Sequence, residues 1–200
     1  MQPNTHPGGK LAAITFLTMA DRDAVAAHIG ALAPDDRAMR FGWSGPASPE
    51  QLVRFATVLL QAVHEAPSLV QFGGWDASRQ ALLYMGSFHC PSPRERTVAE
   101  FSMSAVPSAR GGLTSEVMAW LIPQLIQRGY RKLSLVYENT NPAVAAIAAR
   151  HGFQVKSNGG VSFGTLDITP QAQVARLWLE KLDAFLALVR PALRSPGARL

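Results

Sequence analysis

Residues 97–115 read TVAEFSMSAVPSARGGLTS, and within this stretch the side-chain pattern changes from that of a strand to that of a helix. Apolar and small polar side chains alternate over residues 98–106, which is typical of a strand. The glycine pair at 111–112 interrupts the alternation. The threonine–serine pair at 114–115 can cap a helix, and apolar side chains then recur every three to four residues. The stretch therefore predicts a strand, a glycine turn and a helix.

The rest of the chain alternates between the same two periodicities. Short runs of alternating or β-branched side chains predict strands at residues 11–16, 69–75, 82–88, 133–137, 153–155 and 161–168. Apolar side chains at helical spacing, bounded by capping residues, predict helices at residues 20–32, 34–41, 49–66, 141–151 and 171–189. This order of elements indicates an α/β fold with a mixed sheet.

The chain divides into three parts. Residues 1–10 are polar and contain prolines and glycines, so we expect a flexible tail there. Residues 11–168 form one domain of ordinary size. Residues 169–200 hold an amphipathic helix and a tail with three arginines. The apolar face of that helix either covers the sheet of its own chain or packs against a second subunit in a homodimer.

Composition excludes several classes of protein. Of the 200 residues, 48% are apolar and no apolar run approaches the length of a membrane span, so we expect a cytoplasmic globular domain without a membrane partner. The single cysteine, Cys90, excludes a disulfide framework, and the five histidines show no metal-ligand spacing, so we expect no metal. The net charge is +5, but the basic residues are scattered and not interleaved with aromatic ones. We therefore expect a phosphate-bearing cofactor in preference to nucleic acid.

The glycine turn has a chemical as well as a structural interpretation. Glycines allow backbone N–H groups to point at a ligand without Cβ clashes. The start of the following helix adds unpaired N–H donors and a partial positive charge, which together favour a pyrophosphate. A glycine pair before a helix is equally compatible with a plain turn, so this motif alone leaves both interpretations open.

The order strand, glycine turn, helix, strand and helix from residue 99 to residue 153 resembles the core of the GNAT N-acetyltransferases. In that family a loop of the form Gln/Arg-x-x-Gly-x-Gly/Ala binds the pyrophosphate of CoA. Here Gly112 occupies the central glycine position, whereas Ala109 and Thr114 depart from the pattern and Arg110 offers the basic side chain. A second family segment, Asn-x-x-Ala-x-x-x-Tyr-x-x-x-Gly-Phe, matches residues 141–153, with Ala148 in place of the tyrosine.

Two further segments narrow the resemblance. The triplet Ala-Glu-Phe at 99–101 and the run LAPDDRAMRF at 32–41 look like the protein-lysine acetyltransferase domains that are fused to acyl-CoA synthetase-like subunits. Those domains use a glutamate on this strand as general base and often lack the tyrosine. The resemblance implies a GNAT-like mixed, mostly antiparallel sheet flanked by helices, with an added C-terminal helix.

The resemblance also implies a reaction and the residues that perform it. An acetyl group would move from acetyl-CoA, the co-substrate, directly to a primary amine of a protein lysine or a small molecule, with Glu100 as general base. The cofactor-binding residues it implies are Ser104, Ala105, Val106, Arg110, Gly111, Gly112, Leu113, Thr114, Ser115 and Asn141.

Three alternatives stay open at this point. Glu100 alternates with apolar neighbours and is compatible with a solvated face of the sheet. Asn141 precedes a proline and can simply cap its helix. The changed loop and Ala148 are also compatible with a catalytically silent acyl-CoA sensor or interaction module of the same fold.

Overall fold

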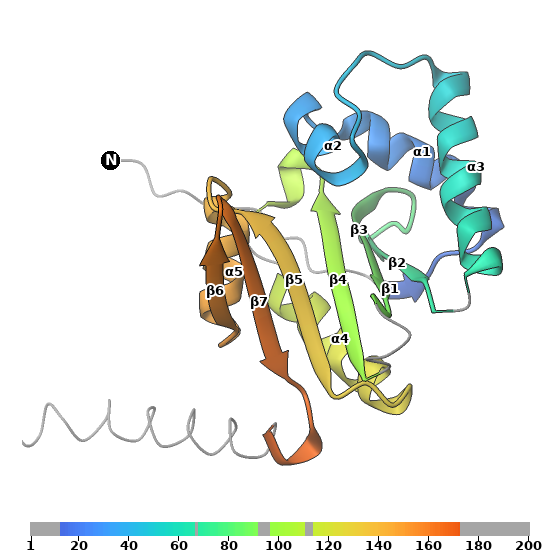
Figure 1. Cartoon of the computed structure of the whole chain (residues 1–200). Coiled ribbons are helices and arrows are strands. Elements are labelled where there is room, and N and C mark those ends of the chain that lie inside the picture. The colour runs from blue at the N-terminus through green and yellow to red at the C-terminus, as the bar shows by residue number, and fades with distance from the viewer. Residues whose placement is uncertain (1–12, 67, 92–96, 111–113, 173–200) are drawn as a thin grey trace, which may run out of the picture.

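A seven-stranded sheet in the order β1-β2-β3-β4-β5-β7-β6 forms the centre of the molecule (Figure 1). The computed structural model describes residues 13–66, 68–91, 97–110 and 114–172. The strands are β1 (Ala13–Phe16), β2 (Val70–Trp75), β3 (Leu82–His89), β4 (Val98–Ala105), β5 (Lys132–Glu138), β6 (Gln154–Asn158) and β7 (Val161–Asp167). Neighbouring strands are antiparallel except for β4 and β5, which are parallel. The expected mixed, mostly antiparallel sheet is confirmed.

The helices follow the capping signals in the sequence. They are α1 (Arg22–Ala31), α2 (Pro34–Phe41), α3 (Pro49–Glu65), α4 (Thr114–Gln127) and α5 (Pro142–Arg150), with short 3₁₀ turns η1 (Met19–Asp21) and η2 (Pro107–Ala109). At the start of α3, Ser48 Oγ accepts from the Gln51 N–H at 3.3 Å, and Gln51 Oε1 accepts from the Ser48 N–H at 2.8 Å. This reciprocal capping box fixes the first turn of the helix.

One predicted helix begins differently from the expectation. The sequence predicts a single helix over residues 20–32, capped by Asp21, but the structure divides it into η1 and α1. The Asp21 carboxylate makes no capping bond to α1 and instead accepts from the N–H of Thr18 at 2.8 Å. The cap therefore belongs to Thr18, and the chain first forms a 3₁₀ turn.

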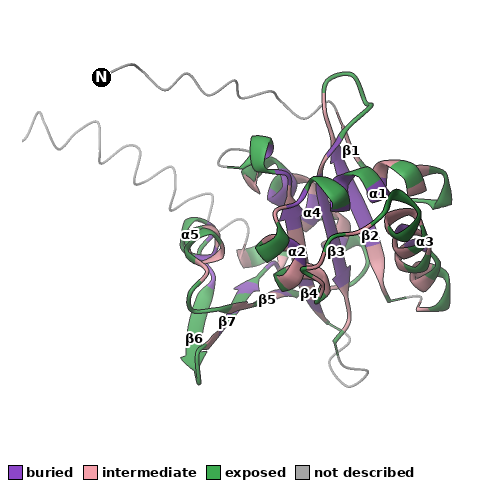
Figure 2. Cartoon of the chain, turned by 90° about the horizontal axis from the view of Figure 1, so that it is seen from above, coloured by how far each residue is buried: buried purple, intermediate pink, exposed green. Residues whose placement is uncertain are grey.

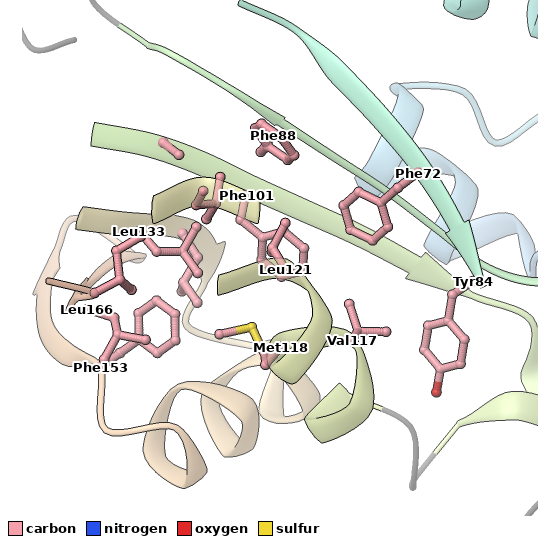
Figure 3. Packing of buried hydrophobic residues seen from close by; sticks show 14 of the residues in the cluster. Phe72, Tyr84, Phe88, Phe101, Val117, Met118, Leu121, Leu133, Phe153 and Leu166 are labelled. Carbon is pink, nitrogen blue, oxygen red and sulfur yellow. The ribbon is translucent and has the colours of Figure 1, made fainter. Parts of the chain in front are cut away.

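Helices cover both faces of the sheet (Figure 2). On one face, α4 packs its apolar side onto the sheet, where Val117 and Leu121 join a buried cluster with Phe72 and Phe101 (Figure 3). On the other face, α1 packs on β3 and α3 packs on α1 and β2, and Ile29 belongs to a second buried cluster. A Cβ on Gly86 would overlap the ring of Phe72, so only glycine lets this ring lie flat against β3.

The predicted C-terminal helix at 171–189 lies almost wholly outside the described residues, so the choice between its two expected partners stays a prediction. Within the described ranges, no helix is both long enough and apolar enough to cross a bilayer.

Candidate functional site

Strands β4 and β5 begin as paired neighbours and then separate. Their parallel ladder includes three residue pairs, from Val98 opposite Lys132 to Glu100 opposite Ser134. Beyond that point β4 stays paired with β3, and β5 stays paired with β7 along its full length. Each strand is thus held by its outer neighbour, and the two diverge towards their C-terminal ends (Figure 1).

A cavity of about 530 Å³ occupies this opening. Its walls are the diverging segments, Phe101 to Ala105 of β4 and Leu135 to Glu138 of β5. Helix α2 supplies part of the lining from one side, and the first turns of α5 supply part from the other. The volume suits a small-molecule ligand. Because the β4–β5 ladder stops at Glu100, backbone polar groups on the inner edge of β4 beyond it can pair with an extended ligand that carries amides.

The described residues on either side of the glycine turn border this cavity. Arg110 and Thr114, which border the turn, both line the cavity, whereas Ser115 lies in the first turn of α4 and outside the lining. The predicted ligand-binding residues Gly111, Gly112 and Leu113 fall outside the described residues. The start of α4, with its free N–H donors and positive dipole end, is therefore next to the cavity.

Arg110 forms an ion pair with Asp36 of α2. The Arg110 side chain is half exposed, so the pair contributes little to stability. Its effect is positional, because it links α2 to the end of the glycine turn and holds the guanidinium at the cavity wall.

The three residues predicted to contact the cofactor at the end of β4 differ in their surroundings. Ser104 and Ala105 line the cavity. Val106 does not: its N–H donates to the Leu83 carbonyl at 3.1 Å, and its carbonyl accepts from the Ala109 N–H at 2.9 Å. Both backbone groups of Val106 therefore already have partners within the protein.

Glu100 lies at the branch point where the two strands separate. It pairs with His89 on one side and with Ser134 on the other, and it is partly buried. Because side chains alternate along a strand, Glu100 lies on the same face of β4 as Ser102 and Ser104. Both of those serines line the cavity but Glu100 does not. Its Cα is two residues, or about 7 Å, from that of Ser102, so its carboxylate can reach a ligand in the cavity through water.

Asn141 combines the two roles that the sequence leaves open. Its Oδ1 accepts from the Val144 N–H at 3.2 Å, which caps α5. The side chain also lines the cavity, and among the described residues its Nδ2 makes a single long contact, of 3.9 Å, with the sulfur of Met39. Capping by the oxygen therefore leaves the amide N–H donors available to a ligand.

A buried polar network beneath the cavity was not predicted from the sequence. His28 of α1 is 2% exposed and lies between the Leu82 carbonyl, 2.8 Å from Nδ1, and Ser104 Oγ, 2.9 Å from Nε2. Since a carbonyl can only accept, Nδ1 carries a proton, and in the neutral ring Nε2 accepts from the Ser104 hydroxyl, which otherwise donates to the Met85 carbonyl at 3.3 Å. Burial has the largest effect and lowers the pKa of His28, the hydrogen bond to the Leu82 carbonyl opposes it, and the positive charge of Arg40 adds a smaller downward effect. The ring is therefore neutral at pH 7.

The same network includes Arg40 from the last turn of α2. Its Nη2 donates to Ser87 Oγ at 2.9 Å, and Ser87 Oγ is 2.9 Å from Ser102 Oγ. Burial lowers the pKa of Arg40 to about 10, so the side chain is still a cation at neutral pH. Arg40 lines the cavity together with Ser102. The only sequence signal for it was membership of the run at 32–41.

The position of the missing tyrosine is now defined. Ala148 is fully buried in the core and does not line the cavity, whereas its neighbour Ile147 does. The phenolic groups that line the cavity belong to Tyr84 and Tyr137. Tyr84 donates to the Ala109 carbonyl at 2.6 Å and so supports the turn structurally. Within the described segments, no three His, Cys, Asp or Glu side chains gather as a metal site would require.

Comparison with known proteins adds information at the level of the fold. No protein-family model matches the chain, and no curated protein sequence matches it significantly. Solved structures do match: the GNAT domain of S. lividans PAT has a TM-score of 0.62 at 15% identity, covering 77% of this chain and 89% of that one. A ribosomal-protein-alanine N-acetyltransferase from Brucella melitensis has a TM-score of 0.61 at 18% identity, with coverage of 78% and 99%.

A third structure was solved with a ligand. It is yncA from Salmonella typhimurium, determined with its cofactor acetyl-CoA, and it matches with a TM-score of 0.57 at 16% identity, covering 79% of this chain and 94% of that one. These structural matches, at low sequence identity, show that the chain has the GNAT fold.

Proposed function

We propose that this protein is an N-acetyltransferase that moves an acetyl group from acetyl-CoA directly to a primary amine, with Glu100 as the general base. The observation that carries the proposal is the opening between β4 and β5, because an unpaired strand edge and a helix start lie along one cavity and Glu100 lies just beyond its lining, at the last residue pair of the ladder. The shared fold with acetyltransferases, one of them solved with acetyl-CoA, supports the choice of co-substrate.

The residues of the cavity fit the parts of acetyl-CoA in order. The pantetheine arm carries amides, and we assign it to the inner edge of β4 at residues 101–105. The pyrophosphate belongs at the turn between Arg110 and Thr114, where a guanidinium and the start of α4 supply positive charge. Asn141 offers its amide N–H donors from the opposite side. Acetyl-CoA supplies an acyl carbon activated by a thiolate leaving group.

The proposed step is a direct displacement. The amine nitrogen bonds to the thioester carbon, the carbonyl oxygen becomes an oxyanion, and the C–S bond then breaks to release the CoA thiolate. Glu100 takes the proton that the amine loses, through a water that spans the distance to the cavity. Backbone N–H groups at the free edge of β4 stabilise the oxyanion. A thiolate is a good leaving group, because the pKa of a thiol is only about 8.5, and it can take its proton from water after it departs; Ala148 at the tyrosine position is therefore compatible with the reaction.

The second candidate is a catalytically silent acyl-CoA sensor with the same fold. It is favoured by Glu100 lying outside the cavity lining and by Ala148 at the tyrosine position. Both candidates require acetyl-CoA binding, and only the first requires amine-dependent release of CoA.

The test measures CoA release from acetyl-CoA with a panel of amines, amino acids and lysine peptides, alongside calorimetry of acetyl-CoA binding. For Glu100→Gln we expect turnover to fall about 10²- to 10⁴-fold, the range for loss of a general base, with acetyl-CoA affinity retained. Glu65→Gln, at an exposed carboxylate in the last turn of α3, is the matched control and should keep full activity. Tight binding without turnover on any amine would establish the sensor, and absence of binding would refute both candidates.

A further inference from the structure

Arg40 is a cation in the cavity that the proposed reaction does not use. It extends from the last turn of α2 to the face of the sheet that carries Glu100, Ser102 and Ser104. Among the described residues it donates one hydrogen bond, to Ser87 Oγ at 2.9 Å, and its Nε is buried there without a hydrogen-bond partner. The guanidinium therefore retains donors that no described protein group satisfies.

Arg40 also has no ion-pair partner within the described part of the chain; its guanidinium lies over the ring of Phe41, 5.1 Å from the centroid, which supplies no opposite charge. The ion pairs there are Arg22 with Asp23 and Arg110 with Asp36. Asp36 lies one turn before Arg40 on α2 and would be its natural partner, but it is engaged by Arg110. A partly buried guanidinium held against neutral hydroxyls loses hydration without gaining an opposite charge. Such a group is well suited to an anionic ligand, above all a carboxylate or phosphate that can accept two parallel hydrogen bonds.

The position of Arg40 along the cavity indicates which of these two anions, a carboxylate or a phosphate, it binds. Its guanidinium lies at the level of Ser87 and Ser102, close to the branch point of β4 and β5. The pyrophosphate site that we propose begins at Arg110, beyond the end of β4 at Ala105. From Ser102 to Ala105 alone the strand advances about 10 Å. The neutral ring of His28 offers no competing charge. The cation therefore faces the acceptor end of the cavity.

We propose that Arg40 binds a carboxylate of the acceptor, and that the acceptor is a free α-amino acid. This inference rests on the proposed function and names its substrate class. The distance from Ser102 to Glu100 is about 7 Å along the strand. One bridging water beside Glu100 takes up about 3 Å of it, which leaves a few ångströms between the carboxylate and the amine. In an α-amino acid the carboxylate and the amine lie at that spacing, whereas the side-chain amine of an internal lysine has no carboxylate so near.

The experiment compares amines that differ only in the carboxylate. Each L-amino acid of a panel with small, aliphatic, aromatic, acidic and basic side chains is assayed beside its primary amide and its decarboxylated amine, with acetyl-CoA saturating. We expect kcat/KM for the preferred acid to exceed that for its amide by about 10- to 100-fold, the range for a hydrogen bond to a charged group. Arg40→Met should remove this preference, and Arg40→Lys should restore part of it, because lysine keeps the charge but not the planar fork.

Separate measurements distinguish failure of this inference from failure of the proposed function. Calorimetry of acetyl-CoA binding tests the function, and its loss in the native chain would refute that proposal independently of the acceptor. Equal turnover of acids and amides, or acetylation of internal lysine peptides alone, would overturn the role of Arg40 while leaving the acetyltransferase intact. If no amine is turned over, the binding of the acids to the CoA-loaded protein is compared with that of the amides. Absence of a preference for the acids overturns the inference. The inference would also be overturned if Arg40→Met weakened CoA binding and left the preference for acids unchanged. That result would assign Arg40 to a phosphate.

Discussion

The buried histidine beneath the cavity predicts a specific dependence of stability on pH. Burial lowers the pKa of His28 in the folded protein below the ordinary histidine value of 6.5. In the unfolded chain the imidazole regains the ordinary value, so below about pH 6.5 the unfolded state binds more protons than the folded state. The free energy of unfolding therefore decreases as the pH falls below this value, and His28 contributes no such change above it.

The magnitude follows from the geometry of the site. Protonation of Nε2 would replace an acceptor by a donor facing the Ser104 hydroxyl, 2.9 Å away, and would place a second cation beside Arg40. A histidine that stays neutral in the folded state costs about 1.4 kcal/mol of stability for each pH unit below its unfolded pKa. Between pH 7.5 and pH 5.5 we therefore expect the contribution of His28 to decrease by up to about 1.4 kcal/mol.

Urea denaturation at a series of pH values measures this contribution in the native chain and in His28→Gln. Glutamine can still donate to the Leu82 carbonyl and accept from Ser104, but it does not titrate. The difference between the two stability profiles isolates His28 from the other four histidines. The variant should be less stable at pH 7.5, and its deficit should shrink as the pH falls. Parallel profiles, or a native protein that gains stability relative to the variant on acidification, would refute a neutral buried His28.

Three further predictions concern the core and the cavity wall. Gly86→Ala should destabilise the protein by about 1–3 kcal/mol, because the new Cβ overlaps the buried ring of Phe72; unchanged urea denaturation would contradict this. Asn141→Asp keeps a capping oxygen but removes the amide donors, so thermal stability should stay nearly constant while calorimetry shows weaker CoA binding. Asp36→Asn releases Arg110 from its ion pair, so CoA should bind more tightly at low salt; an unchanged Kd would show that Arg110 does not contact the phosphates.

Sequence pattern alone located most of the secondary structure. Helix α2 begins and ends where the run at 34–41 predicts, and α3 begins at the predicted Ser48 cap. These signals are local, since a capping serine and a helical apolar repeat act within one or two turns. The correction at Thr18 has a local cause as well, because two neighbouring residues compete for the same helix start.

The ends of the cavity were also visible in the sequence. Arg110, Thr114 and Asn141 were named from motifs and do line it. A turn that precedes a helix and a residue that caps one are placed by their own elements, so their position follows once the fold is known. Val106 differs from them, because it does not line the cavity and its N–H donates to the carbonyl of Leu83 on β3.

The interior of the site was decided by tertiary structure alone. His28 meets Ser104 across 76 residues of sequence, and Arg40 meets Ser87 across 47. No periodicity or spacing reports such contacts, because each depends on how helices from the N-terminal part lie over β3 and β4. The opening itself has the same origin: β4 and β5 separate after three residue pairs because each is held along its length by a different neighbour. The sequence by itself determined which segments are strands and helices, and the packing of those segments decided where the sheet opens and which buried charges face the gap.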